Sequence, residues 1–185
     1  MSRLCFLVVI AIVISFVTAQ NYDKIILRFY FKHSEIIPDV LSVGPASRMT
    51  VQYPNSALFN PGDVLTPTEV KDIPMVSWDN TPNKFYTVVK TDPDVPSREK
   101  PTYREWLHWL VVNVRGDNIT AGDTIAEYVG AGPTKDTGLH RYVFLVYEQP
   151  SWVEFHEPRL TNRYCTIHIR MSPIVNTCHR YALST

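Results

Sequence analysis

Acidic side chains and a histidine gather in residues 91–113, where one apolar run ends and the next begins. Asp92 and Asp94 flank a proline, and His108 lies inside the second apolar run. Because proline cannot donate to a sheet ladder, a strand must end where the two acids stand. A carboxylate beside an imidazole raises the pKa of the histidine and favours the cation that donates from both ring nitrogens. Such a group is suited to holding an anion.

A second polar cluster precedes a later apolar run. Gly130 and Gly132 form a flexible turn, and His140 and Tyr142 follow where the chain enters the next strand. Backbone N–H groups at such a glycine turn are neutral donors for phosphate oxygens. If the two strands are neighbours, both clusters surround one anion cavity, in which the acid orients and charges a histidine without touching the anion.

The same side chains also allow other ligands. Asp92 or Asp94 facing a ligand ammonium would suit a zwitterion such as a phosphoethanolamine head group. A zinc site of Asp92, His108 and His140 has suitable ligand types, but the spacing is not diagnostic. The sequence has neither a Gly-x-Ser-x-Gly elbow nor a phosphate loop ending in Gly-Lys-Ser or Gly-Lys-Thr. We therefore expect a binding protein and not an enzyme, with no metal and no cofactor.

Short runs rich in Val, Tyr, Phe and Trp, separated by Pro, Asn and Gly, must position these side chains. Such runs are typical of strands, so the pattern predicts an all-β antiparallel sandwich with minor helix. Thr66-Pro67-Thr68-Glu69 has the capping pattern of a helix start, and Pro74 would keep that helix short. Strands are expected at 49–53, 85–91, 109–114 and 142–147, with a further alternating segment at 167–171. Alternation places Trp106, His108 and Leu110 on one face and Leu107, Trp109 and Val111 on the other.

Residues 1–19 predict a secretory signal peptide. Arg3 precedes an apolar run over residues 4–17, and Val17-Thr18-Ala19 has the small-residue spacing that a signal peptidase reads. The run is shorter than the ~20 residues that a spanning helix needs, and no basic stop-transfer segment follows, which argues against an uncleaved anchor. The mature chain is expected to be secreted and extracellular, with no transmembrane segment after signal removal.

Residues 20–185 have the length of a single domain with a real core. The formal net charge is zero and there is no basic block, so neither nucleic acid nor an acidic membrane is an expected partner. Cys5 leaves with the signal, so Cys165 and Cys178 can form at most one disulfide. Asn118-Ile119-Thr120 is an N-glycosylation acceptor.

Two long blocks carry a family resemblance. The first is Asp92-Pro93-Asp94-Val95-Pro96-Ser97-Arg98 with the run to Asn113, and the second extends from Gly130 to Gln149. Both resemble signatures of the phosphatidylethanolamine-binding protein family, also called Raf kinase inhibitor proteins. Segments at 37–40, 65–68, 76–79 and 157–158 agree, so the resemblance covers about residues 33–162 and leaves a divergent tail at 163–185. Two separate blocks in the right order are a specific signal.

The resemblance implies a β-sandwich of that family's type, with one small anion pocket and no established catalytic turnover. The expected function is a secreted binding protein for phosphate, phosphorylated or phospholipid head groups, or other small anions. Because relatives restrain kinases and serine proteases, an extracellular serine protease inhibitor or signalling-interaction protein is the alternative. By motif position the ligand-binding residues are Asp92, Asp94, Pro96, Tyr103, Trp106, His108, Gly130, Gly132, His140 and Tyr142.

The chain departs from the family pattern at several places. Leu107 stands where many relatives have a histidine, Val95 replaces a smaller residue, and Asp136 brings negative charge near the glycine turn. The family's C-terminal helix, which flanks the pocket, is expected to be missing or altered. Residues 165–185 contain Pro173 and no helical apolar stripe. We therefore expect that side of the pocket to be open.

Overall fold

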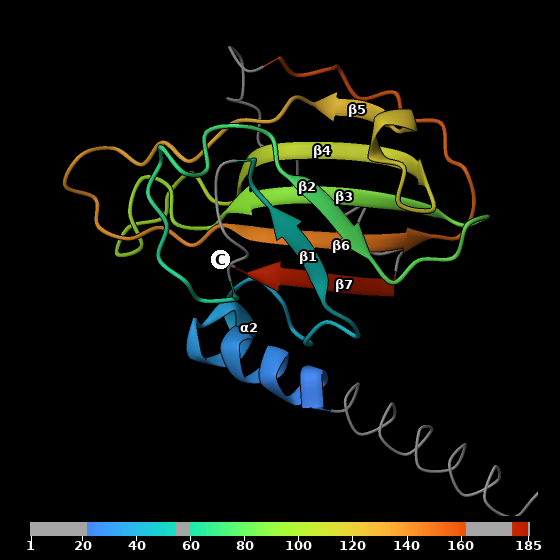
Figure 1. Ribbon diagram of the computed structural model, residues 1–185. Coiled ribbons are helices and arrows are strands. Elements are labelled where there is room, and N and C mark those ends of the chain that lie inside the picture. The colour runs from blue at the N-terminus through green and yellow to red at the C-terminus, as the bar shows by residue number, and fades with distance from the viewer. Residues whose placement is uncertain (1–21, 55–59, 162–178, 185) are drawn as a thin grey trace, which may run out of the picture.

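The computed structural model describes residues 22–54, 60–161 and 179–184. Its centre is a five-stranded antiparallel sheet with the strand order β5-β4-β3-β6-β7 (Figure 1). The strands of this sheet are β3 (Phe85–Asp92), β4 (Trp106–Arg115), β5 (Asp123–Ala126), β6 (Val143–Gln149) and β7 (His179–Ser184).

The three long strands β3, β4 and β6 follow from their composition. Each is rich in Val, Leu or aromatic residues, which fit a pleated surface, and almost every residue in them is buried. Short continuous apolar runs bounded by turn residues are typical of strands covered on both faces. The strands predicted at 85–91, 109–114 and 142–147 are confirmed, with β4 beginning earlier than expected. β7 lies in the divergent tail.

A second, two-stranded sheet covers one face of the first. It pairs β1 (Met49–Gln52), which confirms the strand predicted at 49–53, with β2 (Met75–Trp78), which was not predicted. Figure 1 shows both strands crossing in front of the larger sheet. The core between the sheets includes Met49, Val51, Tyr53, Trp78, Val88, Trp109, Val111, Phe144 and Val146. The predicted β-sandwich is therefore correct.

Helical segments cover part of the opposite face. Residues 22–33 are helical, and the short α2 (Ile36–Asp39) follows. Leu27 and Phe31 are one turn apart and therefore lie on the same side of the helix. No helix in the described part of the chain is long and apolar enough to cross a membrane. The second core includes Leu27, Phe31, Ile36, Leu107, Leu110, Val112, Val143 and Leu145.

A β-bulge at His108 makes the predicted strand faces wrong. Lys90 is opposite Trp109, yet Thr91 is opposite Leu107, so His108 is an extra residue in β4. Leu107 and Leu110, which simple alternation places on opposite faces, both pack in the core beside the helical segments. A bulge shifts every side chain before it to the other face, and bulges occur where a side chain must be re-aimed.

The helix predicted after Thr66 does not form. The capping contacts are present, because the backbone N–H and the hydroxyl of Thr66 each donate to Glu69 Oε2 at 2.7 Å. Residues 67–70 nevertheless form a turn and not a helix. One turn fixes several backbone dihedrals for very few hydrogen bonds, so a cap without a following helical segment does not propagate.

Candidate binding site beside the central strands

The end of β3 and the loop before β6 bring Asp92 and His140 into contact. Asp92 Oδ2 accepts a hydrogen bond from His140 Nδ1 at 2.8 Å, and both side chains are 2 % exposed. Asp92 Oδ1 accepts from the backbone N–H of Asp94 at 2.8 Å. Burial raises the pKa of Asp92, although its hydrogen bonds oppose that effect. Both carboxylate oxygens thus have protein partners.

Both ring nitrogens of His140 have polar partners in the protein. Thr137 Oγ1 lies 2.6 Å from the carbonyl oxygen of Thr134, so its single proton must be donated there. His140 Nε2 lies 3.0 Å from the same hydroxyl, which is then left to accept. Nδ1 lies 2.8 Å from Asp92 Oδ2, so the carboxylate and the hydroxyl of Thr137 together fix the orientation of the ring. This geometry is the arrangement of an acid that orients a histidine.

His108 has a partner at only one of its ring nitrogens among the described residues. Its Nδ1 lies 3.1 Å from the carbonyl oxygen of Val129, which can only accept, while the buried Nε2 has no partner among the described residues. Burial lowers the pKa of His108 to about 4, and nearby Lys90 contributes in the same direction. The expectation of a raised pKa is wrong for this ring, because no carboxylate lies beside it. At neutral pH Nε2 is therefore an acceptor.

Lys90, which was not predicted as a site residue, is buried beside these rings. The residue is 1 % exposed, and its Nζ donates to Tyr128 Oη at 2.9 Å and to the carbonyl of Val129 at 3.2 Å. Desolvation by burial lowers the pKa of Lys90 to about 7, although Asp92 opposes the shift. Tyr86 and Val88 alternate with Lys90 in β3 and both pack in the core between the sheets. This alternation in the sequence could have predicted that the side chain of Lys90 points into the protein.

A cavity of about 270 Å³ opens beside this cluster. Lys90, His140 and Tyr142 line one part of its wall. The ring of Tyr142 also packs edge-on against His108, with 5.2 Å between ring centroids. Burial raises the pKa of Tyr142, so its hydroxyl stays protonated at neutral pH. Apolar side chains elsewhere in the wall are Tyr53, Val64, Leu65, Pro67, Val70, Ala131, Pro133 and Leu139.

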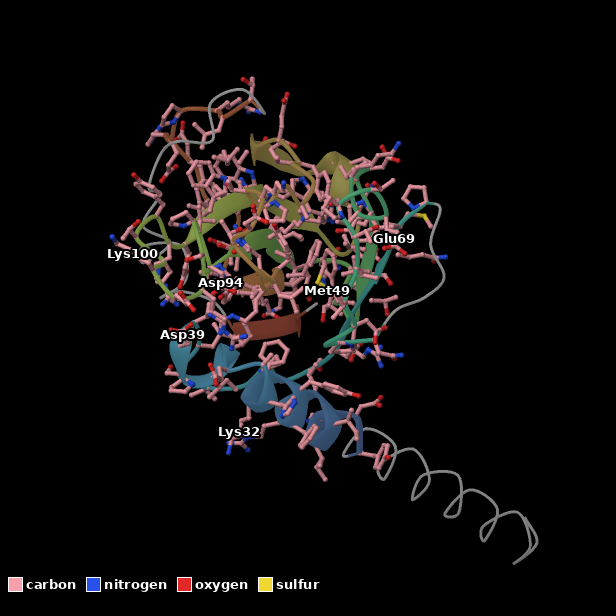
Figure 2. The ribbon with its side chains drawn as sticks, turned by 90° about the vertical axis from the view of Figure 1, so that its left-hand side faces the viewer. Lys32, Asp39, Met49, Glu69, Asp94 and Lys100 are labelled. Atoms are coloured by element: carbon pink, nitrogen blue, oxygen red, sulfur yellow. The ribbon has the colours of Figure 1, made fainter. Side chains whose placement is uncertain are left out.

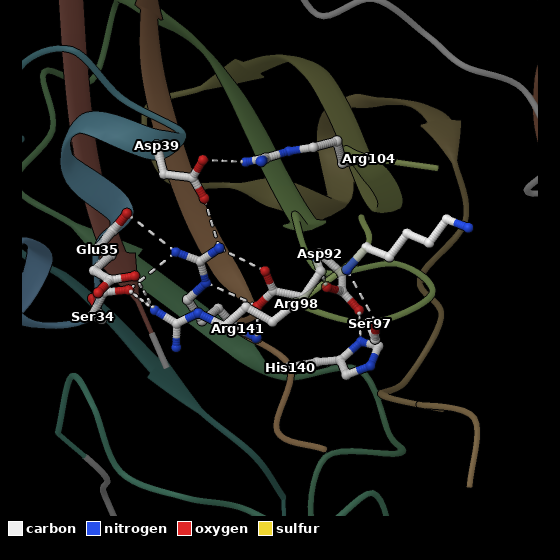
Figure 3. A network of polar contacts seen from close by, with 11 residues as sticks. Ser34, Glu35, Asp39, Asp92, Ser97, Arg98, Arg104, His140 and Arg141 are labelled. Atoms are coloured by element: carbon white, nitrogen blue, oxygen red, sulfur yellow. Dashed lines mark hydrogen bonds and ion pairs between the residues drawn. The ribbon is translucent and has the colours of Figure 1, made fainter. Parts of the chain in front are cut away.

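Asp94 is buried and takes part in a network of ion pairs in which Arg141, Asp39 and Arg104 are labelled in Figure 3. Arg141 donates to Asp94 from Nε at 2.9 Å and from Nη2 at 2.6 Å, and its Nη2 also contacts Asp39 at 2.7 Å. Burial alone would raise the pKa of Asp94, but the hydrogen bonds from Arg141 outweigh it and hold the pKa below its ordinary value. Arg104 binds the other oxygen of Asp39 at 2.8 Å. Asp94 thus has a cationic partner from the protein itself.

Comparison with known proteins assigns the family. The family model described as phosphatidylethanolamine-binding protein matches residues 55–172. This chain belongs to that family. A relative from Drosophila melanogaster, "Putative odorant-binding protein A5", is 42 % identical over 142 residues, which are 77 % of this chain and 67 % of the relative.

Solved structures of similar fold superpose on the chain. The phosphatidylethanolamine-binding protein from Plasmodium vivax has a TM-score of 0.58 at 22 % identity, over 82 % of this chain and 95 % of its own. A carboxypeptidase Y inhibitor, solved in complex with its cognate proteinase, has a TM-score of 0.70 at 24 % identity, over 84 % and 91 %. At these identities the likeness shows the fold, and it confirms the sandwich predicted from the resemblance.

The remaining motif residues of the phosphatidylethanolamine-binding family lie around the same strand ends. Trp106 is opposite Asp92 in the sheet and half-buried, as is Pro96 in the loop after β3. Tyr103 is 54 % exposed, and its backbone N–H donates to the carbonyl of Val95 at 2.9 Å. Of the ten predicted ligand-binding residues, only His140 and Tyr142 line the cavity described above.

The two predicted rim glycines differ in their surroundings. A Cβ at Gly130 would lie 2.9 Å from Lys71 Cα, so only glycine allows this approach of two backbone segments. Nothing lies within 4 Å of a Cβ built on Gly132. Gly130 follows Val129, whose carbonyl accepts from both His108 and Lys90. Gly130 therefore helps to hold the carbonyl of Val129, which positions the side chains of His108 and Lys90.

Other sequence predictions fall partly outside the described residues. The signal peptide, the strand expected at 167–171 and the pair Cys165 and Cys178 all lie there. Asn118 is exposed at the start of a 3-10 turn, where it accepts a hydrogen bond from Thr120 Oγ1 at 2.8 Å. Within the described ranges, no group of three or more His, Cys, Asp or Glu side chains could hold a metal ion.

Proposed function

We propose that this member of the phosphatidylethanolamine-binding family is a secreted binding protein for phosphate-bearing head groups. The observation that carries the proposal is the buried, unpartnered Nε2 of His108 close to the His140–Asp92 pair. An unsatisfied buried acceptor costs about 1–3 kcal/mol, which a ligand that donates to it recovers. The ligand pocket would include Asp92, Asp94, Pro96, Tyr103, Trp106, His108, Gly130, Gly132, His140 and Tyr142.

The partners of the two histidines limit the kind of ligand that can bind. His140 is already held by Asp92 and Thr137, whereas neutral His108 needs a donor. A phosphate monoester, with a second pKa near 6, still carries a P–OH in a fraction of molecules at neutral pH. The ammonium of an ethanolamine head group is the other available donor. A ligand that combines an anion with an N–H or O–H donor therefore fits better than a bare anion.

We expect phosphoethanolamine to bind to the folded wild-type chain in calorimetry and to bind more tightly than inorganic phosphate or ethanolamine alone. His108→Gln and His140→Gln should each weaken binding by roughly tenfold or more, since loss of a hydrogen bond to a charged group costs about 1.5–3 kcal/mol. His156→Gln is the matched control because His156 is exposed and lies outside both motif blocks. Equal affinity of the wild type and these two variants would contradict the proposal.

Secretion can be checked through Asn118. Expressed with residues 1–19 in an insect-cell secretory pathway, the chain should reach the medium with a glycan on this exposed acceptor. Glycosidase treatment should increase the gel mobility of the secreted wild type and leave Asn118→Gln unchanged. Retention of the wild type inside the cells, without a mobility shift, would count against export.

Inhibition of an extracellular serine protease is the second candidate. It is supported by the fold shared with the carboxypeptidase Y inhibitor, at a TM-score of 0.70. No inhibition of a panel of serine proteases at micromolar protein would exclude it.

A further inference from the structure

The hydrogen bonds around Lys90 match a neutral amine better than an ammonium. An ammonium has three N–H donors, but the described residues offer Nζ two acceptors, Tyr128 Oη and the carbonyl of Val129. A neutral amine donates both of its protons to these acceptors and keeps one lone pair. Tyr128 Oη itself donates to the carbonyl of Val70 at 2.9 Å, so this hydroxyl is fixed as an acceptor for Lys90.

No carboxylate of the described residues forms an ion pair with Lys90. Asp92, two residues away in the same strand, binds His140 and the backbone of Asp94 instead. The rings of Tyr128, Tyr142 and Phe144 lie 4.4, 5.2 and 5.6 Å from Nζ and favour a cation. The titratable groups around the amine are Asp92 on β3, His108 on β4, Tyr128 after β5 and Tyr142 before β6.

Lys90 is also part of the wall of the 270 Å³ cavity, whose lining is largely apolar. The cavity therefore joins an amine nitrogen to a surface that favours an aliphatic chain. We propose that Lys90 is a carbonyl-reactive amine that captures small apolar aldehydes from this cavity as an imine. The cavity shares His140 and Tyr142 with the head-group pocket proposed above, but the covalent step needs no phosphate.

The reaction balances without an oxidant or a reductant. The lone pair of Nζ attacks the aldehyde carbon, a C–N bond forms, and the electrons of the C=O π bond move to the oxygen. A proton passes from nitrogen to that oxygen and gives a carbinolamine. Loss of the second N–H proton together with hydroxide releases one water and leaves C=N. Tyr128 Oη, in hydrogen-bond contact with Nζ, is a positioning group for the nitrogen.

The lowered pKa of Lys90 agrees with the hydrogen-bond geometry, which is that of a neutral amine. With a pKa of about 7, half of the Lys90 amines are neutral at pH 7. An ordinary lysine has a pKa near 10.4, so its neutral fraction at that pH is about a thousandfold smaller. Desolvated lysines of this kind are the ones that form Schiff bases.

The test is reductive trapping on the full-length secreted chain. Hexanal and sodium cyanoborohydride at pH 7 convert an imine into a stable hexyl-lysine, which peptide mass mapping locates. Lys84 is the internal control in the same molecule, since its side chain is 48 % exposed and paired with Glu148. We expect Lys90 to be labelled at least about tenfold faster than Lys84, less than the full difference in neutral fraction because a buried amine is harder to reach.

Three further measurements make the result decisive. 1-Hexanol, which has the same chain but no carbonyl, should slow labelling of Lys90 and not of Lys84. Unfolding in urea should abolish the preference, and Lys90→Met should remove the fast adduct. Labelling of Lys90 no faster than of Lys84 in the folded wild type would overturn the proposal, whatever the outcome of the phosphoethanolamine titration.

Discussion

Replacing Arg141 with methionine is expected to destabilise the fold by about 3 to 5 kcal/mol, because removal of one partner leaves a buried carboxylate uncompensated. Asp94 is 0 % exposed and accepts from Arg141 Nε, Nη2 and backbone N–H. The same guanidinium donates through Nη1 to the carbonyls of Ser34 and Glu35, each at 3.1 Å. A loss of this size is a large part of the 5–15 kcal/mol of a typical domain.

Arg98→Met is the matched control for this prediction. Arg98 contacts Glu35 at 2.8 Å, but the two side chains are 42 % and 71 % exposed. An exposed pair of this kind contributes less than about 1 kcal/mol. Urea unfolding of both variants gives the comparison. The combination of Asp94→Asn with Arg141→Met should recover part of the loss, since the unpaired charge is gone. Equal unfolding midpoints for Arg141→Met and Arg98→Met would contradict the prediction.

The consequence of Arg141→Met extends to the candidate site. Asp94 is held by Arg141, and the backbone N–H of Asp94 donates to Asp92, which in turn holds His140. Figure 2 shows Asp94 inside the molecule, close to Asp39 at the end of the helical segment. Release of Asp94 should therefore weaken head-group binding in the fraction of Arg141→Met that remains folded.

The strands were predictable because their composition is local information. β3, β4 and β6 are runs of β-branched and aromatic residues between turn residues, and this pattern needs no knowledge of the partner strand. The two motif blocks likewise placed Asp92 and His140 at strand ends that the fold brings together.

The bulge could not be predicted from alternation. His108 is an extra residue only with respect to the register of β3, which the sequence of β4 does not contain. The prediction of a raised pKa for His108 was wrong for a related reason. Burial lowers this pKa most, and the neighbour that adds to the shift is Lys90, a buried cation on another strand, and not an acid.

Arg141 was missed because its partners are distant in the chain. Its contacts with Asp39 and Asp94 join residues 102 and 47 positions apart. Lys90, by contrast, was visible in principle. A lysine two residues after Val88 and four after Tyr86 belongs to the inward face of a strand.

The stability of the wild type is expected to rise between pH 7 and about pH 9.5, and Lys90→Met should remove most of that rise. The amine of Lys90 keeps its proton up to about pH 7 in the folded chain and up to about 10.4 when unfolded. Between these values the unfolded chain binds more protons, so stability increases with pH. At 1.36 kcal/mol per pKa unit, the increase is roughly 2 to 4 kcal/mol.

The pH range for this measurement is set by neighbouring groups. His108, with a pKa of about 4, stays neutral throughout, whereas burial raises the pKa of Tyr53 to about 12 and so adds an opposite dependence above pH 10. Urea unfolding at several pH values should give diverging curves for the wild type and Lys90→Met. Lys84→Met, which removes an exposed lysine, should run parallel to the wild type.

This measurement also separates two properties that imine capture requires together. A pH dependence that vanishes in Lys90→Met reports a neutral amine in the folded chain, whether or not a ligand can reach it. Hexanal labelling additionally requires access from the cavity that Lys90 lines. Parallel curves for the wild type and Lys90→Met would mean that the three rings, acting through cation–π attraction, hold Lys90 charged at neutral pH. In that case the same nitrogen could only serve as a counter-charge for an anionic ligand.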